Sequence, residues 1–279
     1  MRACLAVPLA LILCVVAPPG LRAQVGCQRA FVPAVDSVRR MVTELGLVGA
    51  GLIIRLKGRT VCEAYVGPIG AATEMPVVSA AKWLSAAAIL VLVDQGKLKL
   101  DDSVSHYLPY FKGAKRGITV RQLLSHTSGL PDYAPCMFQQ ELTLEDCARQ
   151  IGEKVKLRAP PGTEFAYGGA AFTVAGRVAE VAAKATWAEI FSTTIATPLG
   201  LRHTGYGPTA NPLLSEGLTY SSAGDYATFL QMLLDGGVHD GRRILSDSSL
   251  DQMTRDQTVG VARRIGPGGV TDRTYGLGC

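Results

Sequence analysis

The chain has 279 residues, of which 48% are hydrophobic, 18% are charged and 6% are aromatic, and its formal net charge is +5. This composition excludes an intrinsically disordered chain and supplies the core of one large domain or of two closely packed lobes. The basic residues are scattered along the sequence, which disfavours a nucleic-acid-binding function.

The start of the chain has the pattern of a signal peptide. A positive first segment is followed by an apolar run over residues 3–17, and Ala23 offers a small residue at a cleavage site. We therefore expect residues 1–23 to be removed and residues 24–279 to form a secreted or periplasmic domain. An uncleaved N-terminal anchor is the alternative, and lipid attachment at Cys27 is disfavoured because the preceding residues do not fit a lipoprotein signal.

Cysteine usage beyond the signal peptide suits an oxidising compartment. Five cysteines remain there, at positions Cys27, Cys62, Cys136, Cys147 and Cys279. Cys136 and Cys147 flank a short polar loop and are the favoured disulfide pair, and Cys27 with Cys62 is a second candidate. The sequence holds no C-x-x-C and no Cys/His cluster, so we expect neither a metal site nor a cofactor.

The first predicted elements are a helix and a hairpin. Asp36 is expected to cap a helix that ends near Leu45. Two strands, Ala50–Leu56 and Thr60–Val66, flank a tight Lys-Gly turn and are expected to pair as a hairpin.

Helices fill the middle of the chain. They are predicted from capping residues and from Gly or Pro terminators: Ser79 to about Gly96, Thr119 to Leu124, one opened by Thr143 and Asp146, Ala170–Ala183, Thr186 to Thr197 before Pro198, and Ser222 to Asp235. Residues 275–278 are strand-like. Strands around a helical middle predict an α/β (α+β) fold, in which a helical lobe is inserted into an antiparallel sheet. The longest apolar run of these helices, Ala86–Val93, is too short for a stable membrane span.

Ser79 and Lys82 are the first candidates for chemistry. Their spacing of three places both side chains on one face of a helix, where the amine can take the proton of the hydroxyl. A capping serine and a surface lysine would be the ordinary interpretation. It fits poorly because Lys82 is embedded in an apolar helix, and a buried lysine can serve as a base. The helix N-terminus also favours developing negative charge at Ser79.

Two further side chains attract attention. Tyr167 lies in a loop between a Pro-Gly turn and a helix start, from which its hydroxyl could relay a proton. His126 follows Ser125, but neighbouring residues at a helix end point apart and no G-x-S-x-G elbow is present, so we expect a structural histidine.

Five segments, in this order, resemble the β-lactamase-related serine hydrolases, which include class C β-lactamases, D-Ala-D-Ala carboxypeptidases and esterases. They are Ser79–Trp83, Asp94–Asp102, Val120–Leu130, Tyr167–Gly169 and Pro198–Leu201. The resemblance covers roughly residues 30 to 279. It implies a two-lobed fold, with an antiparallel sheet flanked by helices in one lobe and only helices in the other, and an active site between the lobes.

The resemblance also implies residue roles. Ser79 matches the acylated nucleophile, Lys82 its proton partner and Tyr167 the tyrosine of the family's Y-x-N motif. Gly169 stands where that motif has its asparagine, a substrate-binding position. Glycine offers only its backbone there, which favours esterase-like members over efficient β-lactamases.

The chain departs from the family pattern at its end. The family's K-T-G or H-x-G triplet would follow beyond Cys279, and His203-Thr204-Gly205 cannot replace it because it lies in a variable segment. We therefore expect a C-terminally incomplete domain that lacks the last strands, and that folds poorly or exposes a sheet edge.

The sequence thus predicts a secreted serine hydrolase that forms an acyl-enzyme on Ser79 with a small-molecule or peptide substrate: an ester, a D-amino-acid peptide or a β-lactam. The alternative is a catalytically degenerate member that binds cell-wall peptides or a partner without turnover. A Ser-Lys protease is less well supported because the surrounding motifs do not fit one.

Overall fold

The computed structural model describes residues 24–139, 141–212, 214–215, 218–263 and 274–279. The predicted signal peptide, residues 1–23, lies outside the described residues. The described residues fall into two compact units: the first comprises those up to residue 52 with 61–70, and the second comprises residues 53–60 with the described residues from 71 onward. Within the described residues, no helix is both long and apolar enough to cross a membrane.

The first unit combines one helix with most of a three-stranded sheet. Its elements are β1 (Gln24–Cys27), the 3₁₀ turn η1 (Arg29–Phe31), α1 (Val32–Glu44), β2 (Ala50–Leu56) and β3 (Arg59–Val66), and the strand order is β1-β3-β2. Cys27 and Cys62 lie opposite each other in the antiparallel β1–β3 register and form a disulfide. The second candidate pairing is therefore confirmed.

The predicted start of α1 was wrong. The helix begins at Val32, with Pro33 in its first turn, and Asp36 lies inside it, paired with Arg39 on the surface. Proline suits this position because its fixed φ matches a helix and its missing N–H would have had no intrahelical partner.

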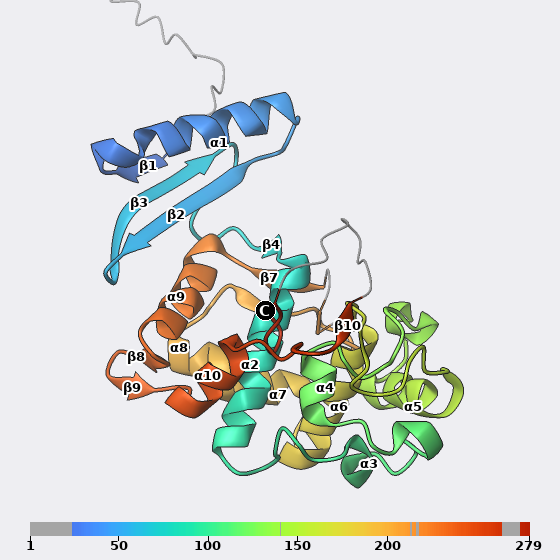
Figure 1. Ribbon diagram of the computed structural model, residues 1–279. Helices are drawn as coiled ribbons and strands as arrows, with labels where there is room; N and C mark the ends of the chain where they lie inside the picture. Colours follow the sequence, from blue (N-terminus) through green and yellow to red (C-terminus); the bar gives the residue numbers. More distant parts are fainter. Residues whose placement is uncertain (1–23, 140, 213, 216–217, 264–273) are drawn as a thin grey trace, which may run out of the picture. The chain divides into compact units, whose positions relative to one another are not determined.

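The second unit is built around α2 (Ala81–Asp94), which the 3₁₀ turn η2 (Val78–Ala80) precedes. Eleven of the fourteen residues of α2 are buried, as expected of a helix in a core. It packs against α6 (Ala170–Ala183), α7 (Trp187–Phe191) and α10 (Asp247–Thr254). Figure 1 shows α2 running through this unit between α9 and α10 on one side and α4 and α6 on the other.

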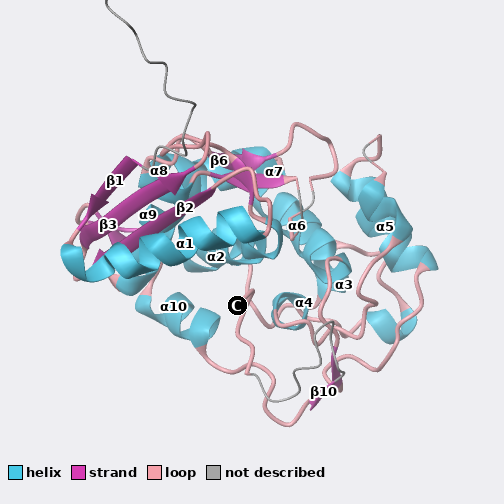
Figure 2. Cartoon of the chain, turned by 90° about the horizontal axis from the view of Figure 1, so that it is seen from above, coloured by secondary structure: helices cyan, strands magenta, loops and turns pink. Residues whose placement is uncertain are grey.

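Several of the surrounding helical segments, though not all of them, begin at predicted caps. The surrounding segments are α3 (Val104–Tyr107), η3 (Gly113–Lys115), α4 (Val120–Leu124), η4 (Pro135–Phe138), α5 (Leu144–Lys154) and α9 (Ala223–Leu234). The side chains of Thr119, Thr143, Thr186 and Ser222 each accept a backbone N–H of the first helical turn, which confirms the predicted caps. In Figure 2, α4, α5 and α6 form the helical side of this unit.

One predicted helix is interrupted. After α7, the chain passes through a π-helical turn, η5 (Ser192–Ala196), into α8 (Thr197–Leu199). Pro198 lies in the first turn of α8 rather than ending a helix at Thr197 as predicted. The helical path is continuous into α8, and a wider π-helical turn, in which the Thr197 N–H donates to the Ser192 carbonyl, directly precedes the proline, which has no N–H to donate.

Short strands complete the second unit. β4 (Met75–Pro76), β7 (Thr219–Ser221) and β6 (Thr204–Tyr206) pair antiparallel in the order β4-β7-β6, β5 (Glu164–Phe165) pairs parallel with β10 (Ala262–Arg263), and β8 (Val238–His239) pairs with β9 (Arg242–Arg243). Residues 275–278, predicted as a strand, form a loop instead. Leu277 and Gly278 donate their N–H groups to Met253 and Leu124 rather than to a ladder, and Gly278 has a positive φ of 84°.

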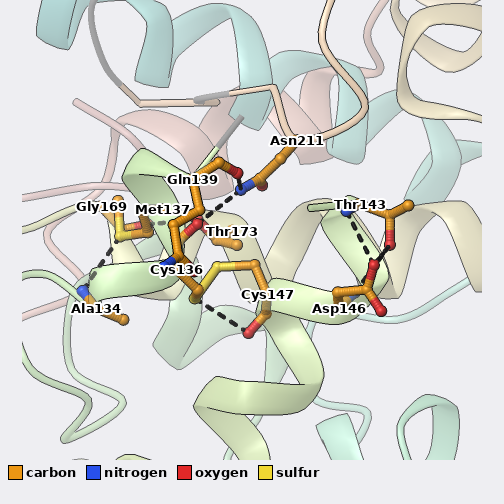
Figure 3. Close-up of a disulfide and its surroundings, with 10 residues drawn as sticks. All are labelled: Ala134, Cys136, Met137, Gln139, Thr143, Asp146, Cys147, Gly169, Thr173 and Asn211. Atoms are coloured by element: carbon orange, nitrogen blue, oxygen red, sulfur yellow. Dashed lines mark hydrogen bonds between the residues drawn. A yellow bond between two sulfur atoms is a disulfide. The ribbon is translucent and has the colours of Figure 1, made fainter. Parts of the chain in front are cut away.

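The favoured disulfide, Cys136–Cys147, is also confirmed. It joins η4 to α5, and the buried Asn211 amide donates to the carbonyl oxygens of Cys136 (2.9 Å) and Gln139 (3.4 Å), as Figure 3 shows. The segment that enters α5 is therefore fixed by a covalent bond and by hydrogen bonds.

Replacement of both Cys136 and Cys147 by alanine is expected to lower the free energy of unfolding by about 2–3 kcal/mol, because the short closed loop gains entropy in the unfolded chain. Urea denaturation measures the change. Cys279→Ala, which removes a cysteine outside both disulfides, serves as the control. An unchanged unfolding midpoint in the double variant would contradict the expectation.

Candidate active site

Ser79 lies in η2, the 3₁₀ turn immediately before α2, and its side chain is half-buried. The turn is anchored by the Val77 N–H, which donates to Thr219 of β7 at 3.0 Å, and by the Ala80 N–H, which donates back to Val77 at 3.0 Å. The preceding Val78 has a φ of 47°, which is a strained conformation for a β-branched residue. The chain thus presents Ser79 on a fixed, strained turn at the head of the central helix.

Lys82 is fully buried, as the sequence predicted, although it belongs to a charged residue type. Its Nζ donates to Ser79 Oγ at 3.3 Å and to the carbonyl oxygen of Ser215 at 2.9 Å. It also lies 4.5 Å from the centre of the Tyr167 ring. Three candidate residues from two distant parts of the sequence therefore meet at one amine.

The segment at Leu214 and Ser215 was missed by sequence reasoning. Ser85, one turn after Lys82 on α2, donates to the carbonyl of Leu214 at 2.5 Å, and its Oγ lies 2.7 Å from the Tyr206 hydroxyl. Lys82 and Ser85 thus hold consecutive carbonyl groups of the same segment. The i,i+3 spacing of Lys82 and Ser85 was the available sequence signal, since a backbone carbonyl has none of its own.

Tyr167 is held by the residues on either side of it. The Ala166 N–H donates to the carbonyl of His126 at 2.9 Å, and the Gly169 N–H donates to the carbonyl of Asp132 at 2.7 Å. Gly169 is buried, and its own carbonyl accepts the Thr173 N–H at 3.1 Å. The backbone of Gly169 is therefore engaged within the protein, and its substrate-binding role stays a prediction.

His126 is buried beside this loop. The hydroxyl oxygens of Ser125 and Thr127 lie 2.9 Å apart and form a hydrogen bond. Burial, with a contribution from the Lys82 charge, holds the pKa of His126 well below its usual value, so the ring is neutral at physiological pH. His203 immediately precedes β6 in the sequence, and its Nδ1 lies 3.3 Å from Oε1 of Glu74. Neither arrangement forms a serine–histidine pair.

Gly168→Ala is expected to lower the free energy of unfolding by about 1–3 kcal/mol, because the new Cβ would lie 2.1 Å from the backbone oxygen of Asp132. Displacement of the neighbouring Tyr167 should also slow acylation about tenfold or more. Thermal melts and reaction with a fluorophosphonate measure both effects. The control is Gly117→Ala, whose Cβ meets no atom within 4 Å. Equal behaviour of the two variants would contradict the expectation.

The described part of the chain holds no group of three His, Cys, Asp or Glu residues that could bind a metal. A cavity of about 790 Å³ lies beside α7 and β6, lined in part by Trp187, Phe191 and Tyr206, but Ser79, Lys82 and Tyr167 do not line it. The Ser79 cluster therefore lies outside this cavity, and its residues are brought together by hydrogen bonds.

Curated proteins of known name match part of this chain. The chain is 29% identical over 160 residues to Protein flp of Staphylococcus aureus (strain N315), covering 54% of this chain and 32% of the relative. It is 30% identical over 223 residues to Penicillin-binding protein 4 of Amycolatopsis lactamdurans, covering 65% and 56%. The chain thus spans about a third to about half of the length of these curated relatives.

Solved structures share the fold. One described as a "putative beta-lactamase from Bacteroides dorei DSM 17855" has a TM-score of 0.81 and 33% identity, over 89% of this chain and 78% of the other. "EstCE1, a hydrolase with promiscuous acyltransferase activity" has a TM-score of 0.71 and 24% identity, over 89% and 82%, and supports the fold alone. The family model named Beta-lactamase matches residues 34–279, and the chain belongs to the beta-lactamase family.

Proposed function

We propose that this protein is a secreted serine hydrolase that forms an acyl-enzyme on Ser79. The observation that carries the proposal is the fully buried Lys82 amine, 3.3 Å from Ser79 Oγ and 4.5 Å from the centre of the Tyr167 ring. A buried amine beside a hydroxyl at the head of a helix is the arrangement that activates a serine without histidine.

In the proposed reaction, the Ser79 hydroxyl passes its proton to the Lys82–Tyr167 pair while Oγ forms a bond to the substrate carbonyl carbon. The carbonyl oxygen takes up the electron pair, and the positive end of the helical segment stabilises that charge. Collapse of this intermediate breaks the bond to the leaving group, which receives the proton through Lys82 and Tyr167. Water then attacks the acyl-enzyme and releases the acid, with the same groups moving the proton in reverse.

Esters are the substrate class that we favour over D-amino-acid peptides and β-lactams. Amide substrates offer an N–H and a side chain to be recognised, and Gly169 has no side-chain amide to bind them. The N–H of Gly169 is already donated to Asp132. An ester requires less of this recognition, and an alkoxide leaves more readily than an amine.

A hydrolysis panel tests the proposal: a p-nitrophenyl ester, nitrocefin and a D-Ala-D-Ala peptide, each with the wild-type chain and with Ser79→Ala. We expect ester hydrolysis by the wild type and its loss in the variant. No turnover of any substrate, together with no covalent adduct on Ser79, would overturn the proposal.

A second function is supported by the same glycine. A degenerate member would bind cell-wall peptides or a partner without turnover, and the lack of a side chain at Gly169 favours it. It predicts that the D-Ala-D-Ala peptide binds wild type and Ser79→Ala equally in calorimetry, with no product formed. Product formation that depends on Ser79 would exclude it.

Secretion after cleavage behind Ala23, which leaves a domain of residues 24–279, is part of the proposal. Two disulfides support an oxidising compartment. N-terminal sequencing of the exported protein tests this part: a first residue near Gln24 is expected, and an exported chain that begins at Met1 would refute cleavage.

A further inference from the structure

His126 is a buried polar side chain for which the proposed reaction has no use. It follows α4 in a turn with a φ of 58°, a left-handed conformation that asparagine, aspartate and histidine adopt more readily than other side chains. Strained residues of this kind persist where the surrounding structure holds them, often beside functional groups.

His126 contacts the residue before Tyr167, the residue after it and the Tyr167 ring. The His126 carbonyl accepts the Ala166 N–H at 2.9 Å, and its Nδ1 accepts the Gly168 N–H at 3.4 Å. The His126 ring itself lies 4.7 Å, centre to centre, from the ring of Tyr167. One residue thus contacts the backbone before Tyr167, the backbone after it and the side chain between.

The hydrogen bonds also define the tautomer of the ring. Because the Gly168 N–H is directed at Nδ1, that nitrogen carries the lone pair and the proton is on Nε2. Nε2 lies 3.1 Å from the Tyr275 hydroxyl and donates to it. The Phe172 ring, 5.3 Å away, packs against the imidazole and limits its rotation.

We propose that His126, as the neutral Nε2–H tautomer, is the positioning residue that fixes the loop 166–168 and thereby keeps Tyr167, whose hydroxyl relays the proton in the proposed reaction, beside the Lys82 amine. This inference rests on the proposed function, because it assigns His126 a role in the same acylation step. His126 acts through Tyr167 and is not itself a catalytic residue.

The test compares two variants, each of which places a polar atom near the position of one of the two ring nitrogens. His126→Asn keeps an acceptor close to the position of Nδ1 and suits the left-handed backbone, whereas His126→Gln reaches the position of Nε2 and loses the acceptor for Gly168. The measurement is the second-order rate constant of labelling by a fluorophosphonate, corrected for the folded fraction from thermal melts. We expect His126→Asn to stay within about threefold of wild type and His126→Gln to fall about 10- to 100-fold.

The Tyr167→Phe background distinguishes positioning from general stability. If His126 acts through the Tyr167 hydroxyl, the difference between the Asn and Gln variants should shrink to less than about threefold there. Tyr275→Phe leaves the histidine in place and removes only the partner of Nε2, so labelling within about threefold of wild type is expected. This variant keeps the inference testable if a His126 variant does not fold.

Equal losses in His126→Asn and His126→Gln, an undiminished difference in the Tyr167→Phe background, or a loss in Tyr275→Phe as large as that expected for Gln would overturn the inference. Failure of the proposed function gives a different result, because the wild-type chain and Ser79→Ala would then label equally slowly.

Discussion

Ser79→Ala is expected to lower kcat/KM for an ester substrate by about 10⁴-fold or more, because alanine has no hydroxyl to form the covalent bond to the acyl carbon. The half-buried serine contributes one hydrogen bond to Lys82, so the melting temperature should change little. Initial rates with a p-nitrophenyl ester measure the effect.

Ser125→Ala is the matched control for this experiment. Ser125 is the serine next to His126, and its hydroxyl bonds to Thr127. Its removal should leave the rate within about threefold of wild type. Substantial activity in Ser79→Ala, or a comparable loss in Ser125→Ala, would show that Ser79 is not the nucleophile.

Lys82→Met is expected to slow acylation of Ser79 by about 10³-fold, since the apolar side chain keeps much of the buried volume but can neither accept the hydroxyl proton nor donate to Ser215. The free energy of unfolding should change only modestly, because the methionine side chain fills much of the space that the lysine side chain occupied. Fluorophosphonate labelling kinetics and urea denaturation measure the two effects separately.

The chain offers a second buried lysine as the control. Lys115 Nζ donates to the carbonyl groups of Ile151 and Gly152 in α5, at 2.8 and 2.6 Å. Lys115→Met should therefore cost about 1–3 kcal/mol of stability while the labelling rate of the folded protein stays within about threefold of wild type. A Lys82→Met variant that labels as fast as Lys115→Met would refute the assigned role of Lys82.

Local signals predicted much of the second unit. The caps at Thr119, Thr143 and Thr186 were found because a capping side chain and its N–H partner lie three residues apart. The bounds of α6, Ala170–Ala183, were also correct, since they follow from helical periodicity and a flanking glycine. Elements that depend on contacts within a single turn are readable from sequence.

Elements that depend on distant partners were not predicted correctly. The strand expected at residues 275–278 became a loop because its N–H groups meet Met253 and Leu124 instead of another strand. The π-helical turn η5 after α7 likewise has no local signal in the sequence. Tertiary contacts decided both cases.

The candidate site likewise contains contacts that the sequence predicted and contacts that it did not. The proximity of Ser79 and Lys82 follows from their helical spacing, and it was predicted. The approach of Tyr167 was implied by family resemblance, whereas the Ser215 and Asp132 carbonyl groups that complete the surroundings were missed. Backbone acceptors carry no residue type, so sequence reasoning cannot select them before the fold is known.

The most direct test of this account is to locate the covalent bond itself. Wild-type protein is treated with a fluorophosphonate, its intact mass is measured, and the modified peptide is sequenced by tandem mass spectrometry. The account predicts one adduct, on the hydroxyl oxygen of Ser79, forming much more slowly in Lys82→Met. An adduct on another residue, or equal labelling of wild type and Ser79→Ala, would contradict it.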